Sequence, residues 1–204
     1  MDVPQTVFDP AQLKPVDIYK LMIGLIVPRP IGWVGTRSAD DTLNLAPFSF
    51  FNGVSSEPPT VIFSSGTTKR EKDSLANARA TGEFTLNVVT EDLAEAMVLT
   101  AGEYLADVDE FVVAKLTPVI GDLVAAPRVA EAKASMECKV VQVVDVGDPP
   151  AAAVVFGEVV RFHVNSDILD GTRVDPVALR AVGRMAGTGY TRTRELFFID
   201  RPEV

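Results

Sequence analysis

The sequence predicts a mainly β fold, an antiparallel β-barrel with peripheral helices. Its apolar runs are short, alternate with polar residues and end at turn residues, and Glu83–Val89 (EFTLNVV) is the clearest case. Long helical patterns are few, and no regular succession of strand and helix indicates a parallel sheet. The 14 prolines and 14 glycines favour many short elements joined by turns.

The expected elements follow from local signals. In order, they are a helix at 15–23, strands at 31–36, 43–52 and 60–65, a helix at 73–80, a strand at 83–89, a helix between Thr90 and Gly102, strands at 131–146 and 151–164, and a short helix after Asp175. The first two strands flank the polar turn 37–41, which is typical of a hairpin. Pro47 removes a backbone donor and so places its strand at an edge or a bulge.

Helix boundaries are marked by characteristic residues. Gly82 is the favoured residue just past a helix C-terminus. Thr90, followed by two carboxylates, is typical of a helix N-cap. Asp175 precedes a proline, which is favoured at the first helical position. Met97 lies on the apolar stripe of its helix, so we expect it to pack in the core.

Two stretches of the sequence are assigned no helix, strand or binding motif. The segment 106–129 is predicted to be a loop, and its Asp107, Asp109 and Glu110 a solvated acidic stretch, because no alternating oxygen-ligand pattern with a central glycine is present. The glycines of 183–192 resemble a dinucleotide-binding fingerprint. No strand leads into them and no βαβ unit surrounds them, so we reject that interpretation.

The composition bounds the class of protein. With 204 residues, we expect a single domain over residues 1–204. A hydrophobic content of 47% with 23% charged residues supports a packed core. The formal net charge of −9 repels nucleic acid and anionic membranes, so we expect neither as a partner. An anionic ligand then needs a local positive pocket.

Metal and disulfide chemistry have few residues to use. The one cysteine, Cys138, excludes an internal disulfide, and with a single histidine we expect no metal site. Cys138 alternates with polar neighbours, so we expect it to be buried in a strand. The first residues lack a basic start and an apolar core, and the apolar run Leu21–Val27 is too short to span a membrane. We therefore expect a cytoplasmic protein.

Polar side chains gather where the strands between residues 36 and 77 end. Hydroxyls, an amide and cations precede a helix start at Asp73 or Ser74, and they are Thr36, Ser38, Asn44, Ser49, Ser64, Ser65, Thr67, Lys69, Arg70 and Lys72. A helix start offers free N–H groups and a positive dipole end, which together with cations suits a phosphate. The alternative is that these side chains simply face water.

Three segments in this order resemble the flavin reductase-like family: 28–34 (PRPIGWV), 44–51 (NLAPFSFF) and 72–77 (KDSLAN). No single motif is decisive, but their order and spacing are specific, and the likeness extends through 117–118, 127–131 and 157–160 to 182–184. The family comprises FMN-binding split-barrel proteins, including flavoredoxins and the reductase components of two-component monooxygenases. Two departures are visible. The turn 38–41 reads Ser-Ala-Asp-Asp where the family has Asp-Gly, and Ser74 replaces a threonine but keeps the hydroxyl.

The resemblance implies a Greek-key split barrel that forms a homodimer, with FMN bound at or near the subunit interface and NAD(P)H as co-substrate. The residues expected to bind the cofactor are Thr36, Ser38, Asn44, Ala46, Pro47, Ser49, Phe51, Ser64, Ser65, Lys69, Lys72, Asp73, Ser74, Arg184 and Tyr190. No catalytic side chain is required, because flavin carries the hydride chemistry. His163 either caps the barrel rim or lines the nicotinamide or flavin groove. Trp33 either packs in the core or a subunit contact, or stacks on the cofactor.

These observations support several functions. The leading one is an NAD(P)H-dependent flavin reductase that supplies reduced FMN to a separate flavin-dependent monooxygenase. The others are a reductase of ferric iron or another acceptor with tightly held FMN, a flavoredoxin-like electron carrier, and a flavin-storage protein. The sequence does not separate NADH from NADPH, or a diffusing flavin substrate from a held cofactor.

Overall fold

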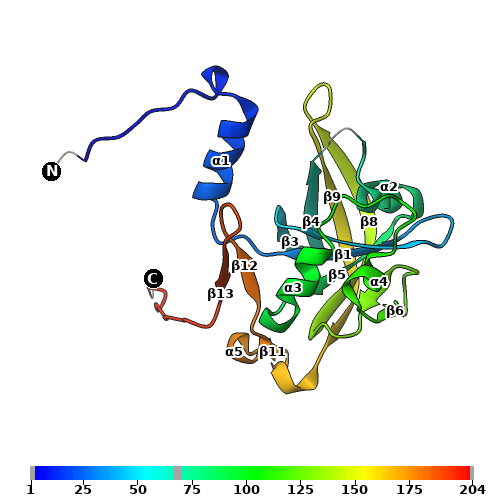
Figure 1. Ribbon diagram of the computed structural model, residues 1–204. Helices are drawn as coiled ribbons and strands as arrows, with labels where there is room; N and C mark the ends of the chain where they lie inside the picture. Colours follow the sequence, from blue (N-terminus) through cyan, green and yellow to red (C-terminus); the bar gives the residue numbers. More distant parts are fainter. Residues whose placement is uncertain (1–2, 67–69, 203–204) are drawn as a thin grey trace.

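A computed structural model describes residues 3–66 and 70–202 of the chain. Its main element is an antiparallel sheet that curls around a core (Figure 1). The spatial order of its strands is β2 (Leu43–Phe48), β1 (Gly32–Arg37), β5 (Glu83–Val88), β8 (Ala134–Val146), β9 (Ala152–Val164), β4 (Pro59–Gly66) and β3 (Phe51–Ser56). The predicted mainly β, antiparallel class is therefore confirmed.

Short helices and three small hairpins complete the described part of the chain. The helices are α1 (Pro15–Leu25), α2 (Asp73–Thr81), α3 (Ala94–Leu99), α4 (Glu110–Ala114) and α5 (Pro176–Leu179), with 3-10 turns η1 (Pro10–Gln12), η2 (Glu91–Leu93) and η3 (Ser166–Ile168). The hairpins are β6 (Pro118–Ile120) with β7 (Pro127–Val129), β10 (Leu169–Asp170) with β11 (Arg173–Val174), and β12 (Val182–Arg184) with β13 (Tyr190–Arg192). No helix of this described part is long and apolar enough to cross a membrane.

The first hairpin agrees with the sequence. β1 and β2 pair antiparallel around the predicted turn, and β2 lies at one edge of the sheet, where Pro47 was expected. The expected single strand 43–52 is wrong, because the chain leaves β2 at Phe48 and begins β3 at Phe51. The two strands lie at opposite ends of the strand order but only two residues join them, so the sheet must curl until its two edges meet.

Two further expectations need correction. The segment 106–129 is not a plain loop, since it holds α4, β6 and β7, whose three to five residues are too few for a periodic pattern to be recognised. Thr90 does not cap a helix with its side chain. It is buried and bridges to Ala181, so its backbone joins the β12 region to the barrel, and α3 begins only at Ala94 and ends at Leu99 rather than at Gly102.

The core has two parts. Inside the barrel, the rings of Phe48, Phe63 and Phe84 pack with centroids 4.9 and 5.2 Å apart, and α2 covers them. A second cluster lies under α3 and α4 around fully buried Trp33, whose indole N–H donates to Thr100 at 2.8 Å. Trp33 is thus a core residue, Met97 is buried as expected, and Cys138 is buried in β8, where burial raises the pKa of its thiol.

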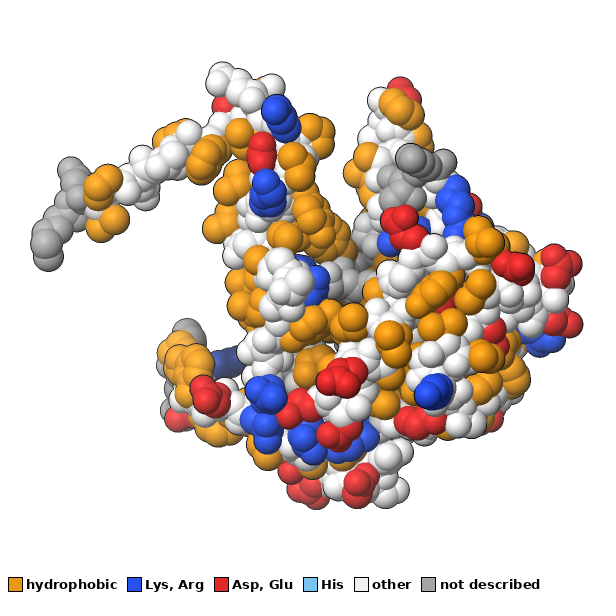
Figure 2. Space-filling model, viewed as in Figure 1, with side chains coloured by type: hydrophobic (Ala, Val, Ile, Leu, Met, Phe, Trp, Pro, Cys, Tyr) orange, Lys and Arg blue, Asp and Glu red, His pale blue; other side chains and the backbone are white. Residues whose placement is uncertain are grey.

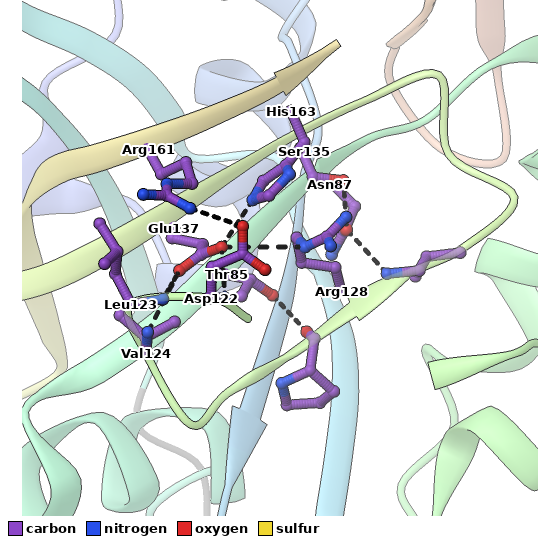
Figure 3. Close-up of polar contacts among 12 residues, drawn as sticks. Thr85, Asn87, Asp122, Leu123, Val124, Arg128, Ser135, Glu137, Arg161 and His163 are labelled. Atoms are coloured by element: carbon purple, nitrogen blue, oxygen red, sulfur yellow. Dashed lines mark hydrogen bonds and ion pairs between the residues drawn. The ribbon is translucent and has the colours of Figure 1, made fainter. Parts of the chain in front are cut away.

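A buried carboxylate fastens the β6–β7 segment to the sheet (Figure 3). Glu137 of β8 has no exposed surface and accepts N–H groups from Asp122, Leu123 and Val124 at 2.6–3.1 Å. His163 of β9 lies 2.6 Å from the same carboxylate. Burial on its own would raise the pKa of Glu137, but these N–H groups and the imidazole outweigh it and hold the pKa below its ordinary value.

The α1 helix and the β12–β13 hairpin, here called the arm, stand apart from the barrel (Figure 1). Arg29 links the two parts. Its buried guanidinium donates to the carbonyls of Ile23, Ile26 and Met185 and to Ser49, while its backbone pairs with Arg184. No residue of α1 is buried, so the arm presents apolar side chains to its surroundings.

Glu137→Gln tests the carboxylate that fastens the β6–β7 segment. We expect a loss of about 3 kcal/mol in the free energy of unfolding at neutral pH, because the amide replaces one acceptor oxygen by a donor against buried N–H groups. The pKa of Glu137 is lowered in the folded state, so its contribution is present above its ordinary pKa and is lost as the pH falls through the folded value. Urea unfolding at several pH values measures both effects.

The matched control is Glu131→Gln, because Glu131 also accepts a backbone N–H, from Thr117, but is exposed. We expect this control to change stability by less than about 1 kcal/mol. Equal stability losses in the two variants would show that Glu137 does not hold the segment.

Candidate functional site

A cavity of about 570 Å³ opens beside the edge strand β2, within the size range of small-molecule sites. Its wall comes from β2, from the start of α2 and from the connection between α3 and α4. The lining residues are Asn44, Ala46, Pro47, Arg70, Lys72, Asp73, Ser74, Thr100, Ala101, Gly102, Glu103, Tyr104, Leu105 and Glu110. Six of the expected cofactor residues line it together: Asn44, Ala46, Pro47, Lys72, Asp73 and Ser74.

The N-terminus of α2 opens at this cavity. Lys72 is the N-cap, adopts an extended backbone and makes no capping hydrogen bond with its side chain. The first N–H groups of a helix have no acceptor inside the helix, so this end offers donors and a positive dipole end. The helix stops at Gly82, which has φ +70°, as the sequence predicts. An anion therefore fits best at the Lys72 end.

Buried amides and hydroxyls fix this helix end to the sheet. The Asn44 amide donates to Thr36 at 3.1 Å and to Ser74 at 2.8 Å, and the Asn77 amide also donates to Thr36, at 3.1 Å. Ser74 accepts from Asn44, and its own hydroxyl hydrogen, which is bonded to no acceptor among the described residues, can point toward the cavity that Ser74 lines. Thr36 therefore does not line the cavity but holds the Asn44 and Asn77 amides in place, whereas Ser74 lines the cavity.

The cations of the wall are held differently. Arg70 forms an ion pair with Asp73 at 2.8 Å and donates to the Tyr104 carbonyl at 2.6 Å, so it ties the α2 end to the α3–α4 connection. The Lys72 ammonium lies 5.7 Å from the centre of the Phe48 ring. Lys69, the other expected cation, lies outside the described residues.

Glu110 corrects the predicted solvated acidic stretch. It is 5% exposed, lies in the first turn of α4 and accepts the Leu45 N–H of β2 at 3.0 Å. Asp109 caps the same helix by accepting the Phe111 N–H. Burial raises the pKa of Glu110, the Leu45 N–H opposes that shift, and Asp73 and Asp109 add to it. An aspartate followed by a carboxylate and an apolar run is an N-cap signal that could have identified this helix start.

Other expected residues lie away from this cavity. Ser38 lines a separate crevice of about 220 Å³ with Arg37 and Asp41. Ser49 accepts from Arg29, and Phe51 packs against the barrel core. Ser64 is half-buried, and the Ser65 hydroxyl is fully buried with no hydrogen-bond partner among the described residues. Arg184 and Tyr190 stack on each other at 4.6 Å in the arm.

His163 lies with Glu137, not along this cavity (Figure 3). Asp122, Glu137 and His163 hold potential metal-ligating atoms within 4.8 Å of one another. However, the Glu137 oxygens already accept N–H groups, and Arg161 pairs with Asp122 at 2.6 Å. The carboxylates of Glu137 and Asp122 already have hydrogen-bond or ion-pair partners within the chain. We therefore interpret these residues as a structural hydrogen-bonded cluster.

Comparison with known proteins gives one consistent result. Residues 24–181 match the family model described as a flavin reductase like domain. The chain is 44% identical to an uncharacterized protein of Aquifex aeolicus (strain VF5), over 86% of this chain and 89% of that protein. The crystal structure of nitrilotriacetate monooxygenase component B from Bacillus cereus has 32% identity and a TM-score of 0.94, covering 97% of this chain and all of that one. The Pseudomonas fluorescens 2-nitrobenzoate 2-nitroreductase NbaA has 27% identity and a TM-score of 0.88, covering 97% and 96% of the two chains.

Proposed function

Because the chain belongs to the flavin reductase-like family, we propose that it is an NAD(P)H-dependent flavin reductase that supplies reduced FMN to a separate oxygenase. Membership of the family and the split-barrel fold support a flavin-dependent oxidoreductase. The likeness to component B of a monooxygenase supports the oxygenase as the partner. The nicotinamide donor and the choice of FMN are the finer parts of the proposal.

The N-terminus of α2, whose first residues line the cavity, is the observation that carries this proposal. A phosphate monoester fits there, because helix N–H groups, Lys72 and the Ser74 hydroxyl all offer donors at one end of the cavity. Ala46 and Pro47 of β2 line another part of the same wall, with room for the remainder of a nucleotide. The flavin ring accepts hydride itself, so the chain has to bind and orient it but need not supply an acid–base pair.

Anaerobic reduction of FMN tests the reaction. With the purified protein present, NADH or NADPH should bleach the visible absorbance of FMN far faster than in its absence, and the faster of the two identifies the donor. Bleaching by dithionite with none by either nicotinamide would contradict the reductase assignment. The electron-carrier function would then replace it.

Lys72→Ala tests the phosphate end of the cavity. We expect FMN binding to weaken by about 1.5–3 kcal/mol, because a charge-assisted hydrogen bond is lost, while riboflavin binding changes little. Quenching of flavin fluorescence measures both affinities. Lys139→Ala, at an exposed lysine of β8, is the control and should change neither. Equal weakening of FMN and riboflavin would show that Lys72 does not contact the phosphate.

A second candidate is the reduction of another acceptor with tightly held FMN. The likeness to a 2-nitroreductase, at 27% identity over almost the whole chain, favours it. The visible spectrum of the purified protein separates the two functions, since a tightly held flavin stays with the protein through gel filtration and a diffusing flavin substrate does not.

The arm supports a homodimer as the assembled form. Leu25 and Tyr19 of α1 are 80% and 55% exposed, and Phe197 and Phe198 of the following tail are 84% and 89% exposed. Figure 2 shows a hollow between the arm and the barrel with apolar side chains on the arm's side. Apolar surface of this extent is typical of an interface, and a two-fold pair buries the arm of each copy. Arg184 and Tyr190, which lie in the arm, would then cover the site of the other copy.

Leu25→Asp tests this assembly. We expect light scattering of the native protein to give about twice the 21.9 kDa chain mass, and the variant to shift toward the single chain because it places a charge in an apolar contact. Lys20→Ser, at an exposed position of the same helix, should leave the mass unchanged. A stable single chain at micromolar concentration with FMN bound would contradict the dimer.

A further inference from the structure

The charges of the cavity wall do not suit an anion if every group is ionised. Among the described residues that line it, Arg70 and Lys72 are set against three carboxyl groups, those of Asp73, Glu103 and Glu110. Arg70 is already paired with Asp73. Among these described residues one lysine then faces two carboxyl groups, in a chain whose net charge is −9, so neutralising one of those two would favour a bound phosphate.

Glu110 is the carboxyl group placed to do so. It is buried whereas Glu103 is exposed, and its Oε2 is fixed by the Leu45 N–H. Leu45 adjoins Asn44, and the Asn44 amide is bonded to Ser74 in the first turn of α2. Glu110 also lines the same cavity as Asp73 and Ser74, and the charge of Asp73 acts on its carboxyl, so Glu110 lies near the start of α2.

We propose that Glu110 is a specificity-determining residue that binds the phosphate monoester of the ligand as a neutral carboxylic acid. In that state its O–H donates to a phosphate oxygen, and its other oxygen still accepts from Leu45. Above the pKa of Glu110, where the carboxyl of the free protein is ionised, binding of the ligand takes up one proton from solvent. That proton binds to the Glu110 carboxylate, and no other bond changes. A ligand without the phosphate gains nothing from this donor. The inference rests on the proposed function, because it concerns the same cavity.

The surroundings of Glu110 favour protonation. Burial raises the pKa of its carboxyl, the N–H groups of Leu45 and of Glu110 itself act against that shift, and Asp73 and Asp109 add to it. The other charged groups of the cavity wall are Lys72 and Arg70 at the α2 end and Glu103 in the α3–α4 connection. The residues that β2 contributes to the wall are uncharged. A bound phosphate adds negative charge and stabilises the protonated acid further.

Glu110→Gln separates this role from a purely structural one. Glutamine keeps the acceptor for Leu45 and presents an N–H donor at every pH, so it imitates the protonated acid. Affinities for FMN and riboflavin are measured by fluorescence quenching from about pH 6 to 9. In the native protein, FMN affinity should fall by up to tenfold per pH unit above the pKa of Glu110. In the variant, FMN affinity should follow only the titration of the FMN phosphate itself and be higher than native at alkaline pH, while riboflavin affinity is unchanged in both.

Glu95→Gln is the matched control, because it removes the same charge from an exposed position of α3 that does not line the cavity. It should retain the native pH profile. The titration of the FMN phosphate itself is common to all three proteins and cancels in the comparison. Calorimetry in two buffers of different ionisation enthalpy should show proton uptake with FMN in the native protein and less in Glu110→Gln.

The outcomes are distinct. A Glu110→Gln profile that parallels the native one, or an equal loss of FMN and riboflavin binding, would overturn the assignment and leave Glu110 a structural acceptor for Leu45. Thermal unfolding of the variant detects that structural role. Failure of FMN to bind at any pH would instead overturn the proposed function, and the assignment of Glu110 with it.

Discussion

The amide of Asn44 is the contact on which the site depends. It stands on the edge strand β2 and donates both to Thr36 at the end of β1 and to Ser74 in the first turn of α2. All three side chains are buried, so losing the amide would remove the donor to the buried Ser74 hydroxyl and leave Thr36 only the donor from Asn77. Because these bonds set the start of α2 against β2, the free N–H groups of the helix open into the cavity rather than into solvent.

Two buried glutamates show how the same side chain serves two purposes. Glu137 accepts three backbone N–H groups and an imidazole, and its pKa is lowered. Glu110 accepts one N–H from another element, lies near two aspartates, and its pKa is raised. The Glu137 carboxylate, which accepts all of these hydrogen bonds, holds the β6–β7 segment against the sheet. A carboxyl that accepts fewer N–H groups and lines a cavity can still bind a ligand and a proton.

The sequence predicted what depends on local signals. The β1–β2 hairpin, the edge position of Pro47, the helix closed by Gly82 and the gathering of Lys72 and Ser74 at its start all follow from neighbouring residues. Glu110 was misjudged because its partner, Leu45, lies 65 residues away, and only the docking of α4 on β2 buries it. For His163, the sequence left two alternatives open, a position at the barrel rim or one along the nicotinamide or flavin groove. Its contact with Glu137 depends on the pairing of β8 with β9, which periodicity does not specify.

The most direct measurement of the central claim is a crystal structure of the protein grown with FMN. The account predicts the phosphate at the N-terminus of α2, within hydrogen-bond distance of Lys72 and Ser74, with the rest of the nucleotide along Ala46 and Pro47. A phosphate bound instead in the crevice beside Ser38, or a flavin whose phosphate points away from α2, would contradict it.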